Sequence, residues 1–352
     1  HKPPMSDTSS TNPNTPTSPE STPFIPSTTT NTTDPSFIDS SSSPSLPKVQ
    51  SAINSLASIL TAIPPSLSST QNPAFILLHD PDISSQISSL LHNPDSGAGD
   101  DNLCRWLYNT FQSTDPDLQL VVLRFLPIIA GIYLSRVKLR KPLAGFEAVL
   151  LALYAHETTS RAGQPIVVNV PDLSHPSIYH ESKTPLKNNV ATGLSLAVVS
   201  PSLEPHGTVR STRRARIVGV ALELYYSKIS QMPVRSKIDF CEFCEEWAGQ
   251  YDSEHGDKEK PRMVGRICLP WELLQPVLRI LGHCLLGTDN RDQELLDVAC
   301  RACRSLYARS LHDINHKAIL ATGSLHRLAK LDTDPENNID HTEIAINNVL
   351  SL

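Results

Sequence analysis

The chain has 352 residues, a formal net charge of −6 and an isoelectric point near 6.1. A dedicated nucleic-acid-binding protein usually presents a strongly basic face, so this charge balance argues against that class. The seven cysteines are an odd number scattered through helical patterns, which is typical of reduced thiols and of a cytosolic compartment. No basic start followed by an apolar run is present at the beginning of the sequence, so we expect no secretory signal.

Residues 1–47 differ in composition from the rest of the chain. They contain 22 Ser or Thr residues, 10 of the 29 prolines and a single Lys or Arg residue, Lys2. Such a segment cannot bury enough apolar surface to offset the entropy of ordering. We therefore predict a disordered Ser/Thr/Pro-rich leader over 1–47, a helical domain over 48–331, and an acidic, mostly flexible tail over 332–352.

From residue 48 onward, apolar residues recur at intervals of three and four, interrupted by proline and by polar stretches. This periodicity predicts a mostly α fold with one multi-helix domain. The helices are expected at 48–63, 82–91, 102–113, 116–136, 142–159, 213–229, 233–249, 270–286, 291–311 and 315–331. Two short β-branched runs, Ile166–Val170 and Leu194–Val199, predict a small β-hairpin or irregular excursion around 166–200.

The segment Leu118–Leu134 is apolar enough to require a choice between a membrane span and a core helix. Arg124 and Pro127 lie inside it, and a charge near the middle of a span costs about 2.5–3.5 kcal/mol. Its length also falls at the bottom of the spanning range. We therefore predict a buried core helix kinked at Pro127, and no transmembrane segment.

Two Cys-x-x-Cys pairs, Cys241 with Cys244 and Cys300 with Cys303, raise the question of a structural zinc site. The pairs lie much farther apart than the roughly 12–20 residues usual between such pairs. Both also fall within helical patterns, where a small buried side chain fits. We expect core thiols here, with neither a metal nor another cofactor.

The densest imidazole cluster contains His175, His180, Glu181 and His206. A zinc hydrolase would favour His-Glu-x-x-His on a helix, whereas these residues surround Pro176 in an expected loop. The sequence also contains no nucleophile elbow, Gly-rich phosphate loop or kinase-type residue set. We expect no catalytic residues, and a metal-dependent hydrolase is the least favoured alternative.

One strongly basic patch consists of Arg210, Arg213, Arg214 and Arg216. Together with the basic residues of 136–141, it fits an anionic lipid surface, which contributes roughly 1 kcal/mol per basic residue. It equally fits a solvated helix start or contact with an acidic partner. Arginines at a helix start oppose the helix dipole, so a nearby anion is expected in any of these cases.

A second surface candidate follows Pro270 on one face of an expected helix. Its residues are Trp271, Leu274, Val277 and Leu278. They are either a contact for a protein scaffold or ordinary core, and the core interpretation is favoured because isolated apolar stripes usually face inward.

Several segments together resemble the hyccin family from about residue 100 to 331. The most specific is Leu173-Ser174-His175-Pro176-Ser177-Ile178-Tyr179-His180-Glu181. The others are the apolar segment 118–134, the Leu-rich segment 145–154, and the helix 216–229 that is followed by Met232-Pro233. Ala155-His156 follows Tyr154, where family members often carry Asn. The long leader and the missing long C-terminal tail look more like plant members.

The resemblance implies a mostly helical, non-catalytic accessory subunit of the plasma-membrane phosphatidylinositol 4-kinase type III alpha complex. In that complex a hyccin clasps a tetratricopeptide-repeat scaffold, which links the kinase to a lipidated membrane anchor and supports phosphatidylinositol 4-phosphate synthesis. The expected location is therefore cytosolic, with peripheral recruitment to the plasma membrane. The competing hypothesis is a peripheral membrane protein that acts through its basic patch alone.

Overall fold

A computed structural model describes residues 46–61, 67, 70, 72–137, 139–171, 194–205, 209, 210, 212–249, 270–287 and 292–333. Residues 1–45 of the predicted leader and 334–352 of the predicted tail lie outside these residues, whereas Leu46 and Pro47 begin a helix and Asp332 and Thr333 end one. Within them the fold is mostly α, with one small antiparallel sheet, as the sequence predicts.

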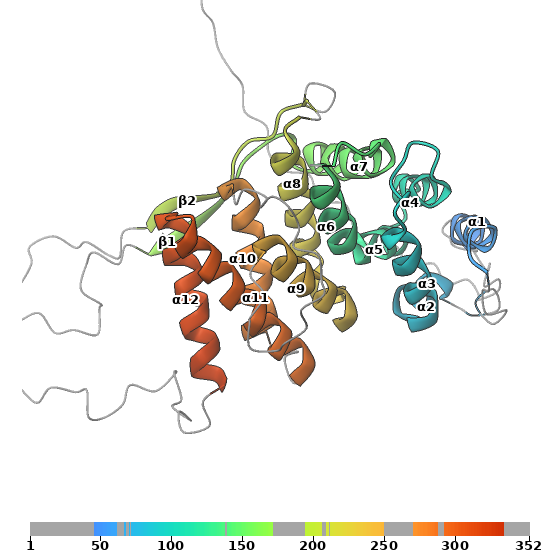
Figure 1. Ribbon diagram of the computed structural model, residues 1–352. Helices are drawn as coiled ribbons and strands as arrows, with labels where there is room; N and C mark the ends of the chain where they lie inside the picture. Colours follow the sequence, from blue (N-terminus) through green and yellow to red (C-terminus); the bar gives the residue numbers. More distant parts are fainter. Residues whose placement is uncertain are drawn as a thin grey trace, which may run out of the picture. The chain divides into compact units, whose positions relative to one another are not determined.

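Twelve α-helices and two strands make up the described part of the chain (Figure 1). The first seven helices are α1 Leu46–Ala57, α2 Pro73–His79, α3 Pro81–His92, α4 Asn102–Gln112, α5 Pro116–Arg124, α6 Leu126–Val137 and α7 Ala144–Ser160. The strands β1 Ile166–Pro171 and β2 Leu194–Ser200 follow. The remaining helices are α8 Arg214–Ser227, α9 Val234–Ala248, α10 Trp271–Leu286, α11 Gln293–His312 and α12 His316–Thr333.

The expected helix at 116–136 is two helices, α5 and α6, with an angle of 46° between them. The break falls at Phe125 rather than at Pro127, because proline is accommodated in the first turn of the new helix. Leu118, Val121 and Ile129 are fully buried, so this segment is core. No single described helix is long and apolar enough to cross a membrane; only this bent pair passes by length and composition.

One further helix boundary differs from the prediction, and one helix was not predicted. Helix α1 ends at Ala57 rather than continuing to residue 63, and the tighter bond from Ile59 N to Leu56 O closes its last turn. Helix α2 was not expected at all. Its start is nevertheless encoded locally, because Asn72 caps the amide of Phe75 at 3.2 Å and Pro73 occupies the first turn.

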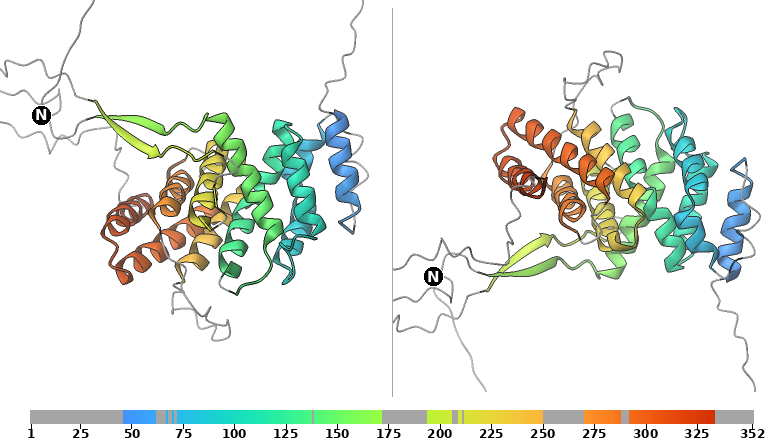
Figure 2. Two further views of the ribbon diagram at one scale, coloured as in Figure 1. Left: turned by 90° about the horizontal axis from the view of Figure 1, so that it is seen from above. Right: turned by 90° about the horizontal axis from the view of Figure 1, so that it is seen from below.

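The helices pack largely in chain order (Figures 1 and 2). Helix α4 packs on α1, α5 and α7, while α7 packs on α8 and α8 on α10. Helices α9, α10 and α12 then pack around α11. The apolar faces merge into one core that runs through all the helices.

Helices α8 and α10 approach each other closely in this core. A Cβ atom at Gly219 would lie 2.6 Å from the backbone oxygen of Glu272. Gly219→Ala is therefore expected to lower the free energy of unfolding by about 1–3 kcal/mol, because the backbones must separate. Gly282→Ala in α10 is the matched control, since its Cβ would meet Leu325 at an ordinary 3.7 Å. The control should gain up to about 1 kcal/mol of helix propensity. Denaturant unfolding of both variants measures the difference, and equal effects would contradict the proposed close packing.

Candidate partner-binding site

Strands β1 and β2 form an antiparallel hairpin whose register fixes two faces. Val167 lies opposite Val198, and Val168 lies opposite Ala197. Because side chains alternate along a strand, the pairs divide between the faces. One face carries Val167, Asn169, Leu196 and Val198, and the other carries Val168, Val170, Ser195 and Ala197.

Apolar side chains on both faces of the hairpin are open to solvent. Leu196 is 69% exposed and Val198 is 58% exposed, and Val168 on the other face is 42% exposed. Neither strand contains a charged residue, although exposed strands are usually protected by charge. In Figure 2 the hairpin extends away from the helices. A two-stranded hairpin is marginally stable alone in water, so a partner that covers this surface would stabilise it.

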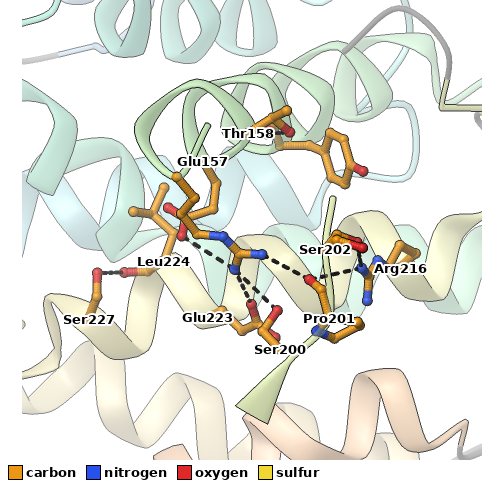
Figure 3. A network of polar contacts seen from close by, with 11 residues as sticks. Glu157, Thr158, Ser200, Pro201, Ser202, Arg216, Glu223, Leu224 and Ser227 are labelled. Carbon is orange, nitrogen blue, oxygen red and sulfur yellow. Dashed lines mark hydrogen bonds and ion pairs between the residues drawn. The ribbon is translucent and has the colours of Figure 1, made fainter. Parts of the chain in front are cut away.

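The base of the hairpin is fixed to the helices by Arg161, which directly follows α7. Its Nη1 donates to Ser200 Oγ and to Glu223 Oε2, both at 3.1 Å, and its Nη2 donates to the carbonyl oxygen of Pro201 at 3.1 Å. Figure 3 shows these contacts around Ser200, Pro201 and Glu223. The guanidinium group thus joins α7, the end of β2 and α8.

This anchor lies in a largely buried environment. The side chains of Arg161 and Glu223 are 10% and 7% exposed, and Glu157 lies 3.7 Å from the guanidinium group. Burial raises the pKa of Glu157, Arg161 opposes that shift, and the neighbouring carboxylate of Glu223 adds to it. One guanidinium group therefore compensates two carboxylates that have little access to water.

Backbone contacts fix the chain on either side of the hairpin. The amide of Leu203 donates to the carbonyl of Gly163 at 2.9 Å, and Tyr154 Oη donates to the carbonyl of Glu204 at 3.2 Å. Gly163 has a φ of 70°, a conformation that side-chain-bearing residues rarely adopt. The two strands therefore leave the helical body at a defined place.

The predicted basic patch is largely engaged within the chain. Arg213 pairs with Glu204, and Arg214 lies 3.6 Å from Glu147. Arg216 Nη2 donates to the carbonyls of Pro201 and Ser202 at 3.4 and 2.8 Å (Figure 3). These carboxylates are the nearby anions that arginines at the start of α8 require. Arg210 is exposed beside them.

The expectation that residues 136–141 enlarge this basic patch toward a lipid surface is wrong for Arg136. This side chain is buried, and its Nη atoms donate to the carbonyls of Ser96 and Asn93, both at 2.7 Å. It satisfies carbonyl groups at and just beyond the end of α3, which the sequence pattern did not indicate.

The four candidate contact residues of α10 differ in burial. Leu274 and Val277 are fully buried in the core, and Leu278 packs partly against it. Trp271 is 39% exposed at the start of the helix. Burial excludes Leu274 and Val277 from any contact surface, because exposing them would require large-scale unpacking. Trp271 is the exposed member of the set.

The motif that carries the family resemblance lies outside the described residues. This applies to Leu173, Ser174, Pro176, Ser177, Ile178, Tyr179, His180 and Glu181, and also to His175 and His206. The metal-hydrolase alternative rests on this segment and therefore stays a hypothesis. Across the part of the chain that the structure describes, no group of three or more His, Cys, Asp or Glu side chains is arranged to hold a metal ion.

The cysteines of α9, α10 and α11 converge in the core. Cys241, Cys244, Cys284 and Cys303 are all buried. A hydrogen bond with Cys284 and burial raise the pKa of Cys241 well above its ordinary value, and burial raises that of Cys303 to about 12. Cys241, Cys244 and Cys303, whose pKa values are all raised, are therefore protonated and unreactive at neutral pH.

Thiol labelling measures this burial directly. Ellman's reagent at pH 8 is expected to leave Cys104 and the four core cysteines unmodified in the folded protein, and to modify all seven after denaturation. Adding EDTA before denaturation should not change the labelling rate of the native protein. Rapid native labelling of three or more thiols, or labelling that EDTA accelerates, would contradict the expectation that these five cysteines are buried thiols without a metal.

The fold and this site define a class of protein: a helical domain that carries a β-hairpin with uncharged strands on a charged, buried anchor. The comparison with known families places the chain more narrowly. The Hyccin family model matches residues 68–349, and the chain belongs to the hyccin family. In general, members of that family are accessory subunits of the phosphatidylinositol 4-kinase complex.

Proposed function

We propose that this protein is a non-catalytic subunit that binds and stabilises the tetratricopeptide-repeat scaffold of a phosphatidylinositol 4-kinase type III alpha complex. Through the scaffold it supports phosphatidylinositol 4-phosphate synthesis at the plasma membrane. Membership of the hyccin family supports the general role. The observation that carries the proposed contact is the pair of uncharged, exposed strands β1 and β2, which Arg161 holds at their base.

The hairpin suits a helical-repeat partner on physical grounds. Stacked helical repeats present extended concave surfaces that accept a protruding element. The Val and Leu side chains that alternate along the strands supply apolar surface for a partner to cover, and fully burying one such side chain is worth about 1.5–3 kcal/mol. A stable contact usually buries more than about 1,000 Å² in total, so the hairpin needs support from a second surface. Trp271 on α10 is our candidate for it.

The remaining partners follow from the scaffold. The kinase and the lipidated membrane anchor are proposed as partners reached through the scaffold, so the protein itself is cytosolic and is recruited peripherally to the plasma membrane. The alternative of a membrane protein acting through Arg210, Arg213, Arg214 and Arg216 alone is less well supported, because three of these arginines already contact Glu204, Glu147 or backbone carbonyls.

Thermal unfolding of the scaffold subunit tests the stabilising role. A partner that binds only the folded scaffold raises its midpoint, by an amount that grows with the partner's concentration over Kd. We expect the scaffold's Tm to rise by several degrees in the presence of the full chain and to stay unchanged with an unrelated helical protein of similar size. An unchanged midpoint at saturating concentration would argue against a stabilising subunit.

A further inference from the structure

The last described helix, α12, buries small side chains and exposes two leucines. Among the described side chains of α12, the buried ones are small: Ala318, Thr322 and Ala329 are 0%, 1% and 3% exposed, while Leu325 packs partly against the core. Large apolar side chains point outward instead, with Leu320 at 73% and Leu328 at 41% exposure. Among the described helices α12 packs chiefly on α11 and α10, so its outer face is not part of the core.

The corner between α11 and α12 continues this apolar surface. Ile314 is 83% exposed and has a φ of 51°, and Leu311 is 47% exposed. A β-branched residue in the left-handed region is a true outlier, since Gly or Asn usually occupies such a position. Both the backbone conformation and the exposure of Ile314 are unfavourable in water, which points to a function for this corner.

Along α12 itself, the charges that precede Asp332 are all of one sign. From Ile314 to Leu331 the chain carries Lys317, Arg327 and Lys330, and no Asp or Glu. Lys317, Leu320, Ser324 and Arg327 recur at helical spacing and are all exposed, so they share one face. Basic residues are therefore interleaved with leucines on a helix of an otherwise acidic protein.

The carboxylate nearest in the sequence, Asp313 in the corner between Leu311 and Ile314, is already paired within the chain. Asp313 lies 2.6 Å from Arg309 Nε and 3.1 Å from His312 Nδ1. Burial opposes its ionisation, but hydrogen bonds from His312 and Arg309 outweigh burial and lower its pKa. The next acidic residue in the chain is Asp332, at the opposite end of α12.

We propose that the outer face of α12, together with Leu311 and Ile314, binds an anionic lipid surface. A helix with leucines and basic residues on one exposed face lies in the plane of a membrane interface, where the leucines enter the acyl boundary and the cations meet lipid phosphates. The exposed corner at Ile314 enters the same boundary. This contact uses residues different from those of the hairpin and does not depend on scaffold binding.

Vesicle flotation of the full chain tests this proposal. The wild-type protein is compared on vesicles of phosphatidylcholine alone and of phosphatidylcholine with phosphatidylserine, at low and at high salt. We expect binding that requires phosphatidylserine and weakens with salt. Each basic residue near such a surface contributes roughly fivefold to binding, so Lys317→Glu with Arg327→Glu should lower the bound fraction at least about tenfold.

Two further double variants make the test specific. Ile314→Ser with Leu320→Ser removes apolar contacts, and it should also reduce binding because both side chains are exposed and their loss leaves the core intact. Arg210→Glu with Arg213→Glu is the charge-matched control and should bind as the wild type does. Circular dichroism verifies that each variant is folded. Absence of phosphatidylserine-dependent binding by the wild type would overturn the proposal and leave this face to a protein partner. Loss of binding only in the Arg210 and Arg213 variant would overturn it in favour of that patch.

Discussion

Replacing Arg161 with methionine is expected to release the hairpin from the helical body. Methionine keeps much of the apolar stem but removes the donors to Ser200, Pro201 and Glu223. Two carboxylates with little access to water, Glu157 and Glu223, then have no cation beside them. Removing one partner of a buried ion pair typically costs about 3–5 kcal/mol. Because the contacts lie at the base of the hairpin, local opening relieves this cost before the body unfolds.

Hydrogen exchange measures the release. Amides of the 194–203 segment should exchange at least about tenfold faster in Arg161→Met, while those of α9 and α11 keep their protection. Arg213→Met is the matched control, because its pair with Glu204 is 59% and 42% exposed and such surface pairs contribute about 0–1 kcal/mol. Equal exchange in the two variants would contradict the role of Arg161 as the anchor.

The loss of folding stability in Arg161→Met should depend on pH. Burial already raises the pKa of Glu157, and the loss of Arg161 removes the group that opposes this rise. A carboxyl group whose pKa is higher in the folded than in the unfolded state destabilises the fold when it is ionised. This destabilisation disappears as the pH falls and the group becomes protonated. The loss of stability in Arg161→Met should therefore be smaller at pH 5 than at pH 8. Adding Glu223→Gln should restore part of the stability, because it removes one unpaired charge.

Leu196→Asp is expected to weaken scaffold binding about a hundredfold or more while leaving the helical body unchanged. Leu196 is 69% exposed at the centre of the hairpin face that also carries Val167 and Val198. Fully burying a leucine side chain is worth about 1.5–3 kcal/mol, and burying a new carboxylate in the contact adds a further penalty. Substitution of an exposed side chain changes folding stability by only about 0.5 kcal/mol.

Leu139→Asp provides the matched control for this binding measurement. Leu139 is 67% exposed, but it lies in the turn after α6 rather than on the hairpin. Titration of the immobilised scaffold with wild-type protein and both variants gives the three Kd values. If Leu196→Asp binds as tightly as Leu139→Asp does, the hairpin is not the contact.

Local sequence signals predicted most of the helices but not the arrangement of the site. Periodicity placed the helices from 102 onward within a few residues, and the β-branched runs indicated β1 and β2. Helix α2 was missed because seven residues are too few for a periodic pattern, although Asn72-Pro73 is a recognisable start. Its cap is a local signal that a closer look at the sequence would find.

The roles of the arginines depend on tertiary structure and have no local signal. Arg161, Arg136 and Arg216 are all bound to groups 14 or more residues away in the sequence. In the sequence, Arg213, Arg214 and Arg216 formed a basic patch, and only the fold shows their carboxylate and carbonyl partners. Arg161 was not singled out at all, since a lone arginine after a helix is usually solvated.

Size-exclusion chromatography of this protein with a tetratricopeptide-repeat scaffold subunit of the kinase complex tests the central claim most directly. The two proteins are co-expressed and separated at moderate salt, so that weak charge contacts do not mimic a complex. The proposed function predicts one stable peak that contains both chains, with Leu139→Asp behaving as the wild type and Leu196→Asp separating from the scaffold. Elution of the wild-type protein apart from a folded scaffold would contradict its assignment as a scaffold-binding subunit.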